Sequence, residues 1–198
     1  TSGLFSPIAI VGRACTLPLA LSPEALWQNV RDRRVCLSRV PEGRWGLAPG
    51  LALASQGAAE ARDRSWSDVG GYVQGFGAVF DPTGFGLEPE HVLALDPVFQ
   101  WTLHTVRAAL RSANIDGPAP HAGLVMGNLS FPTAGMARYA EQTWLRGQRK
   151  LGGSAGIHPH NRFSSGLPAL LTARSLGLGA GAFALDAACA SSLYAIKL

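Results

Sequence analysis

Cysteine and charged residues are both scarce in this chain. Of the 198 residues, 15% are charged, 47% are hydrophobic and only three are cysteines, namely Cys15, Cys36 and Cys189. The cysteine count is odd, and the spacing matches neither CxxC nor another metal-binding pattern. In a sequence without a secretory signal, this indicates reduced thiols, so we expect a cytoplasmic protein.

Long apolar runs are also lacking. No uninterrupted stretch approaches the roughly 18 residues that a membrane-spanning helix needs, so no membrane span is predicted. The start, "TSGLFSPIAIVGRAC", has no basic region ahead of its short apolar stretch and does not resemble a signal peptide. The positive net charge of +4 comes mainly from arginine. This basic character suits either an ordinary solvated face or attraction of an acidic partner. Because the basic residues are not interleaved with aromatic ones, nucleic-acid binding is not predicted.

Short apolar segments bounded by glycine or turn residues predict strands. They are "PIAIVG" (7–12), "AGLVMGN" (122–128) and "AFALDAA" (182–188). The first two are typical of strands that are buried on both faces. A further strand or extended segment is expected to run to Phe80, with a turn at Asp81 and Pro82. The Gly- and Ala-rich stretch that follows "VPEGRW" predicts a long surface excursion.

Helices are predicted between these strands. They cover 23–33, 88–94, 97–114, 131–150 and 161–179, the last with a glycine exit. Proline after Ser22 and after Asp96 is typical of a capped helix start, and Asn114 suits a helix end. The apolar positions expected to face a core are Leu26, Trp27, Val30, Phe99, Leu103, Val106 and Leu110. Strands separated by helices and long connections predict an α/β fold with a layered, mixed sheet.

Cys189 stands out among the chemically reactive residues. It lies in "DAACASS", where a predicted strand changes to a helix, and small residues there allow a sharp turn and close approach of another molecule. A thiol at a helix N-terminus feels the positive end of the dipole, which favours the thiolate, and nearby N–H groups could stabilise an oxyanion. This is the arrangement of a nucleophile elbow with cysteine in place of serine. The residues alone leave open the alternative of a small buried apolar side chain, which we expect for Cys15 and Cys36.

Other polar or glycine-rich segments are not expected to form sites. "GLGAGAF" (177–183) follows a helix and precedes a strand, the reverse of the order that dinucleotide binding requires. "HPHN" has no third metal ligand nearby and is expected to be a surface loop. Asp186 is expected to accept hydrogen bonds from backbone N–H groups. The remaining histidines are expected to be structural or solvated: His91, His104 and His121.

Six segments together resemble the β-ketoacyl synthase domain of the thiolase superfamily. They are "IAIVGRACTLP", "LWQNV", "VPEGRW", "LEPEHVLALDPVFQW", "LVMGN" and "DAACASSLYAIKL", in the order and spacing of that family. The long final region "NRFSSGLPALLTARSLGLGAGAFALDAACASSLYAIKL" is most similar to ketosynthases of polyunsaturated fatty acid synthases and iterative type I polyketide synthases. The resemblance implies the N-terminal half of a layered αβαβα fold, with residues 1–198 ending just after the nucleophile motif.

The resemblance also implies an activity and partners. Cys189 would accept an acyl group from the phosphopantetheine of an acyl carrier protein and supply a backbone oxyanion donor, with no cofactor bound directly. Decarboxylative Claisen condensation with a malonyl carrier protein would follow. The family's catalytic histidines belong to motifs after the cysteine, in the remaining C-terminal half, and none of the five histidines here matches them. Members form homodimers through the strand before the nucleophile, here Phe183 to Ala187.

The resemblance leaves two functional hypotheses. In the first, the chain is part of an active condensing enzyme, although these 198 residues alone are expected to be inactive. In the second, it is a catalytically silent half-domain with a structural or carrier-docking role.

Overall fold

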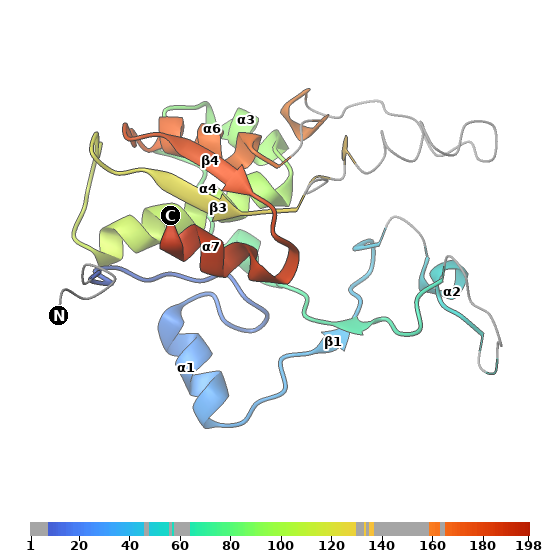
Figure 1. Cartoon of the computed structure of the whole chain (residues 1–198). Helices are drawn as coiled ribbons and strands as arrows, with labels where there is room; N and C mark the ends of the chain where they lie inside the picture. The colour runs from blue at the N-terminus through green and yellow to red at the C-terminus, as the bar shows by residue number, and fades with distance from the viewer. Residues whose placement is uncertain are drawn as a thin grey trace. The chain divides into compact units, whose positions relative to one another are not determined.

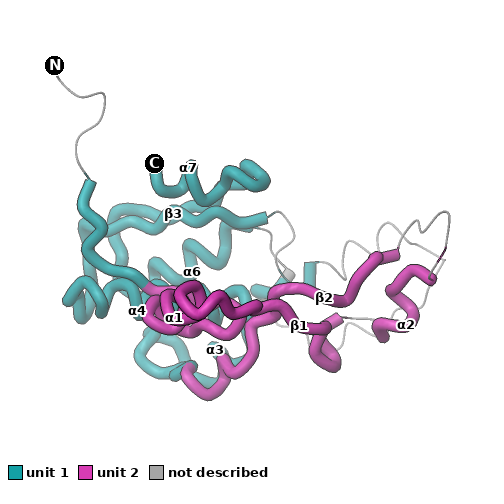
Figure 2. Tube along the Cα trace, turned by 90° about the horizontal axis from the view of Figure 1, so that it is seen from below, with its two compact units in different colours: residues 1–13, 80–198 teal, residues 14–79 magenta. Residues whose placement is uncertain are grey.

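The computed structural model describes residues 8–45, 48–55, 57, 64–129, 133, 135–136, 159–162 and 165–198. It divides into two compact units, one made of 14–79 and the other of 1–13 with 80–198 (Figure 2). Most of the helix predicted at 131–150 and part of the excursion predicted after "VPEGRW" fall outside the described residues. Each unit is considered by itself below.

A pair of parallel strands forms the centre of the larger unit. β3 (Leu124–Gly127) pairs with β4 (Ala182–Leu185) in the register Leu124 with Ala182 and Gly127 with Leu185. Helix α6 (Leu167–Ser175) packs on one face of the pair, and α7 (Ser191–Lys197) packs on the other (Figure 1; Figure 2). Helix α4 (Pro97–Ser112) packs on α6. The predicted α/β class with layered helices and strands is therefore confirmed.

The core of this unit lies around α4 and the short helix α3 (Pro89–Ala94). Its buried members are Phe85, Val92, Leu95, Phe99, Leu103 and Leu171. The predicted cap of α4 is confirmed, because the Asp96 carboxylate accepts a hydrogen bond from the Val98 N–H at 3.1 Å. Asn114 follows the helix with a φ of 58°, a left-handed conformation that ends it as predicted.

Glycines fix the passage from α6 to β4. Gly177 has a φ of 66° and ends the helix, as the sequence predicts. A Cβ at Gly179 would collide with the carbonyl of Pro120, so this position needs glycine for close backbone approach. The segment "GLGAGAF" therefore has a structural role beside residues 117–120.

Among its described residues, the smaller unit contains one regular helix of more than one turn. Helix α1 (Pro23–Arg31) begins at Ser22, whose hydroxyl accepts a hydrogen bond from the Ala25 N–H at 3.2 Å, so the predicted start is confirmed. Strand β1 (Ser38–Arg39) pairs antiparallel with β2 (Val69–Gly70), and a short helix α2 spans Pro49–Ala52. The Arg39 guanidinium fastens this strand pair by an ion pair with Asp68 at 3.0 Å.

The prediction of a strand at 7–12 is wrong for the residues that the structure describes. Residues 8–12 form no regular strand, and Ile8 and Ile10 are 81% and 85% exposed. An apolar run becomes a strand only when a neighbouring backbone completes the hydrogen-bond ladder, and within the described residues no segment pairs with it. Strand β3 is confirmed, but it is half-buried where full burial was predicted.

Three local details also differ from prediction. Helix α1 ends at Arg31, because Arg33 adopts a φ of 53° that a right-handed helix cannot continue through. The predicted core face of α1 is exposed, with Trp27 at 64%, while Asn29 is buried and donates to the Leu19 carbonyl. The segment before Phe80 is not extended throughout, because a 3₁₀ turn, η1, occupies Phe76–Ala78. In the part of the chain that the structure describes, no helix is long and apolar enough to cross a membrane.

Candidate active site

Cys189 lies in a sharp turn between β4 and α7. The turn is a 3₁₀ segment, η3 (Ala188–Ala190), which leads directly into the helix at Ser191. Ala188 has a φ of 50°, and a residue with a Cβ pays about 1 kcal/mol or more for this left-handed conformation. The cysteine is thus the middle residue of a strand–turn–helix elbow, as the sequence predicts.

Two side chains hold the elbow in shape. The Ser191 hydroxyl donates to the Ala188 carbonyl at 2.7 Å and accepts from the Ala187 N–H at 2.9 Å. The Asp186 carboxylate accepts from the Ala188 N–H at 3.0 Å, which confirms its predicted structural role. These bonds satisfy backbone groups of the two residues before Cys189, so the turn keeps its shape without using the Cys189 thiol.

The elbow rests at the carboxyl ends of both strands. A Cβ at Gly127, the last residue of β3, would lie 2.9 Å from the Ser191 Cβ, so only glycine lets the start of α7 approach this closely. The next residue, Asn128, donates its N–H to the Leu185 carbonyl and its side-chain amide to the Ser165 carbonyl, both at 3.0 Å. These contacts position the turn against the sheet.

Exposure separates Cys189 from the other two cysteines. Cys189 is exposed, whereas Cys15 and Cys36 are half-buried. The Cys15 thiol contacts the Ala20 carbonyl at 3.9 Å, and burial, followed by the negative charge of Glu24, raises the pKa of Cys15. The Cys36 thiol contacts the Arg34 carbonyl at 3.6 Å. Cys189 is therefore the thiol that another molecule can reach most readily.

The histidines do not assemble around Cys189 in the described residues. The ring centres of His91, on helix α3, and His160 lie 5.5 Å apart. His160 therefore packs against a helix, whereas the segment "HPHN" that contains it was predicted to be a surface loop. His104 packs edge-on against Phe80, and burial, followed by the charges of Arg107 and Arg111, lowers the pKa of His104. His121 is exposed, and His158 lies outside the described residues. No cluster of three or more metal-ligating side chains occurs in the described parts of the chain.

The comparisons with known proteins identify the family. The family model described as "Beta-ketoacyl synthase, N-terminal domain" matches residues 5–198. The chain belongs to the β-ketoacyl synthase family. This confirms the family predicted from the sequence.

Polyketide synthases and solved ketosynthases are among the relatives. The chain is 37% identical, over 97% of its length, to mycoketide-CoA synthase of Mycobacterium tuberculosis, and 34% identical to the pikromycin polyketide synthase component PikAIII of Streptomyces venezuelae. It spans only 4% and 12% of those proteins. A solved structure named PfaC keto synthase–chain length factor is 30% identical and superposes with a TM-score of 0.79 over 96% of this chain and 22% of its own. The fold is thus the N-terminal part of a thiolase-type ketosynthase.

Ser191 and Gly127 are the site residues that the sequence does not reveal. The string "CASS" contains two serines, and nothing in the letters tells which one turns back to bond the elbow. Gly127 reads as the end of a strand, and its role depends on the approach of α7, which comes 64 residues later in the chain. The only available signal is a glycine at the carboxyl end of a strand, a place where close backbone approach is common.

Proposed function

We propose that Cys189 accepts an acyl group and that the complete ketosynthase domain then lengthens that group by decarboxylative condensation. The observation that carries the proposal is an exposed thiol at a braced strand–turn–helix elbow, in a chain of the β-ketoacyl synthase family. A nucleophile needs both an accessible sulfur and a fixed direction of attack. The Ser191 and Asp186 hydrogen bonds support the fixed direction of attack, because they hold the turn that carries Cys189.

The proposed chemistry has two steps. In the first, the Cys189 sulfur bonds to the carbonyl carbon of an acyl thioester on the phosphopantetheine of an acyl carrier protein, and the carrier thiol leaves with the proton. In the second, a malonyl carrier protein loses carbon dioxide, and the released electron pair forms a carbon–carbon bond to the acyl carbon. Cys189 then leaves as a thiolate and is reprotonated.

The Cys189 N–H is the proposed oxyanion donor. In the elbow, the N–H groups of Ala187, Ala188 and Ala190 donate to Ser191, Asp186 and the Ala187 carbonyl, respectively. The Cys189 N–H is not part of this bracing network. A backbone donor held beside the nucleophile stabilises negative charge as it develops on the carbonyl oxygen.

The proposed assembly includes the rest of the domain and a second copy. We place residues 1–198 in the N-terminal portion of a ketosynthase domain, whose catalytic histidines come from its C-terminal half. The homodimer would form through the strand Phe183 to Ala187. Among the described residues β4 pairs only with β3, and Phe183 is 47% exposed, which leaves an edge for another strand. Fatty acid-type or iterative polyketide synthesis is the proposed setting.

Replacement of the cysteine tests the activity. The full-length protein with Cys189→Ala should form no condensation product from acyl- and malonyl-carrier proteins. Cys36→Ala is the matched control, because it removes a less exposed thiol outside the elbow, and it should keep full activity. Product formation would be measured by mass spectrometry. Unchanged product formation in Cys189→Ala would refute the proposal and favour a silent domain with a structural or carrier-docking role.

A further inference from the structure

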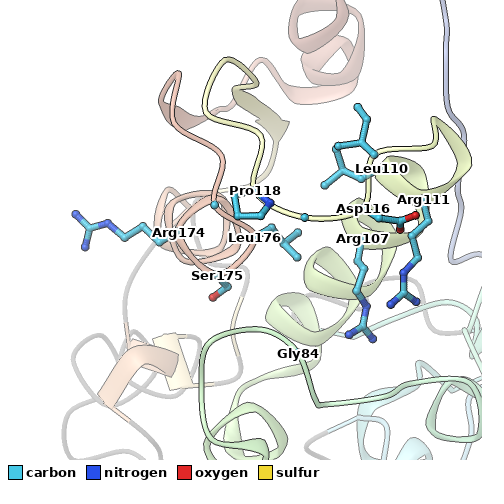
Figure 3. A pocket seen from close by; sticks show the side chains of 12 residues that line it. Gly84, Arg107, Leu110, Arg111, Asp116, Pro118, Arg174, Ser175 and Leu176 are labelled. Atoms are coloured by element: carbon cyan, nitrogen blue, oxygen red, sulfur yellow. The ribbon is translucent and has the colours of Figure 1, made fainter.

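A concave surface lies in the larger unit, between the ends of two helices. It is a pocket of about 500 Å³ where the final turns of α4 and α6 meet residues 115–118 (Figure 3). Its apolar walls include Leu110, Ile115 and Leu176, and three arginines also line it: Arg107, Arg111 and Arg174. The pocket therefore combines apolar surface with strong positive charge.

Arg107 is held rigidly at this pocket. Its guanidinium donates to the carbonyls of Thr83 and Asp81, both at 2.6 Å, and lies 4.0 Å from the centre of the Phe85 ring. A guanidinium has five N–H donors, and these two bonds leave others for a further acceptor. Because the group is already fixed, an anion that binds it has little side-chain entropy to offset.

Arg111 adds a second positive charge beside the first. It follows Arg107 by four residues on α4, and positions with this spacing lie on the same face of a helix, where like charges repel. Figure 3 shows both guanidinium groups extending in the same direction, while Arg174 points away from them. Burial and the charge of Arg111 lower the pKa of Arg107, which agrees with a positive local field.

Among the described residues, the protein offsets this charge only in part, through the Asp81 carboxylate, which interacts electrostatically with Arg107 and Arg111. Asp116 borders the pocket, yet no ion pair shorter than 4.0 Å joins a carboxylate to Arg107, Arg111 or Arg174 among the described residues. Arg111 and Arg174 lie in the last turns of their helices, where a cation complements the carbonyl ends. That effect accounts for Arg111 and Arg174, and the contacts with Thr83, Asp81 and Phe85 account for the position of Arg107. In the described part of the chain, none of these contacts pairs a guanidinium group of the pocket with a carboxylate within 4.0 Å.

We propose that this pocket binds a small molecule in which an oxyanion is attached to a compact apolar body. The oxyanion, a carboxylate or a phosphate, would bind the guanidinium groups of Arg107 and Arg111. The apolar body would lie against Leu110, Ile115 and Leu176. Arginine suits both oxyanions because its N–H groups can donate two parallel hydrogen bonds. This site is separate from the chemistry proposed for Cys189.

Calorimetric titration of the full-length protein tests the proposal. Benzoate and phenyl phosphate present the two oxyanions on the same apolar ring, and benzyl alcohol is the neutral analogue. We expect at least one of the anions to bind saturably, with the tighter one showing which oxyanion the site prefers. Benzyl alcohol should bind at least tenfold more weakly.

Two variants assign the binding to this pocket. Arg111→Gln should weaken the bound anion at least tenfold, because a charge-assisted hydrogen bond is lost. Arg31→Gln is the matched control, since Arg31 also lies in the last turn of a helix, and it should change the affinity less than twofold. Absence of saturable binding, equal binding by the neutral analogue, or unchanged affinity in Arg111→Gln would each overturn the proposal.

Discussion

Replacement of Ser191 by alanine tests how the elbow is braced. The change removes two hydrogen bonds, one to the Ala188 carbonyl and one from the Ala187 N–H, from a residue that is 9% exposed. Each such bond contributes about 1 kcal/mol net. Ala188 is an exposed residue, so a water molecule can replace the serine at its carbonyl and recover part of the loss. We therefore expect the free energy of unfolding to fall by about 1 to 2 kcal/mol.

The same change should slow acylation of the cysteine. Without the serine bonds the turn can relax and move the Cys189 sulfur, and small misplacements of a nucleophile lower rates strongly, here by about tenfold. Stability would be measured by urea unfolding of the full-length protein, and acylation by the rate of thioester formation. Ser192→Ala is the control, because this neighbouring serine is exposed. Equal stability and equal acylation rates in the two variants would refute the bracing role.

Two further changes test the packing and the electrostatics of the larger unit. Gly127→Ala places a Cβ 2.9 Å from that of Ser191, and such overpacking should lower the free energy of unfolding in urea by about 1 to 3 kcal/mol. Gly166→Ala is the control, because a Cβ there meets open space. Equal losses of stability in the two variants would contradict this account. Burial, followed by the charges of Arg107 and Arg111, lowers the pKa of His104 below its ordinary value of 6.5. The His104 imidazole therefore binds a proton more readily in the unfolded chain than in the folded one. The contribution of neutral His104 to the free energy of unfolding should be fully present above about pH 6.5 and should be lost as the pH falls below that value. His104→Asn should flatten that fall, and an unchanged urea midpoint profile between about pH 5 and pH 7.5 would argue against it.

Local signals in the sequence predicted the parts of the fold that local chemistry decides. Ser22 and Asp96 cap helices because their side chains reach an N–H two or three residues away. Asn114 ends a helix through its own left-handed backbone. The elbow at Cys189 was predictable because a strand, small residues and a helix follow one another directly.

Features that depend on distant segments were not predictable in this way. The run 7–12 has the letters of a buried strand, but the described chain offers it no pairing partner. The positive φ of Ala188 could not be predicted from the sequence, because alanine seldom adopts this conformation. The hydrogen bonds to Ser191 and Asp186 keep the Ala188 backbone in it. The arginine pocket likewise joins the ends of two helices that lie more than 60 residues apart in the sequence.

Peptide mapping of the acylated protein tests the central claim most directly. The full-length protein would be incubated with an acyl carrier protein thioester, digested, and searched by mass spectrometry for the acyl group on each cysteine. The account predicts a thioester on Cys189 and none on Cys15 or Cys36, because only the elbow presents an exposed thiol. An adduct on Cys36 with Cys189 unmodified would contradict it.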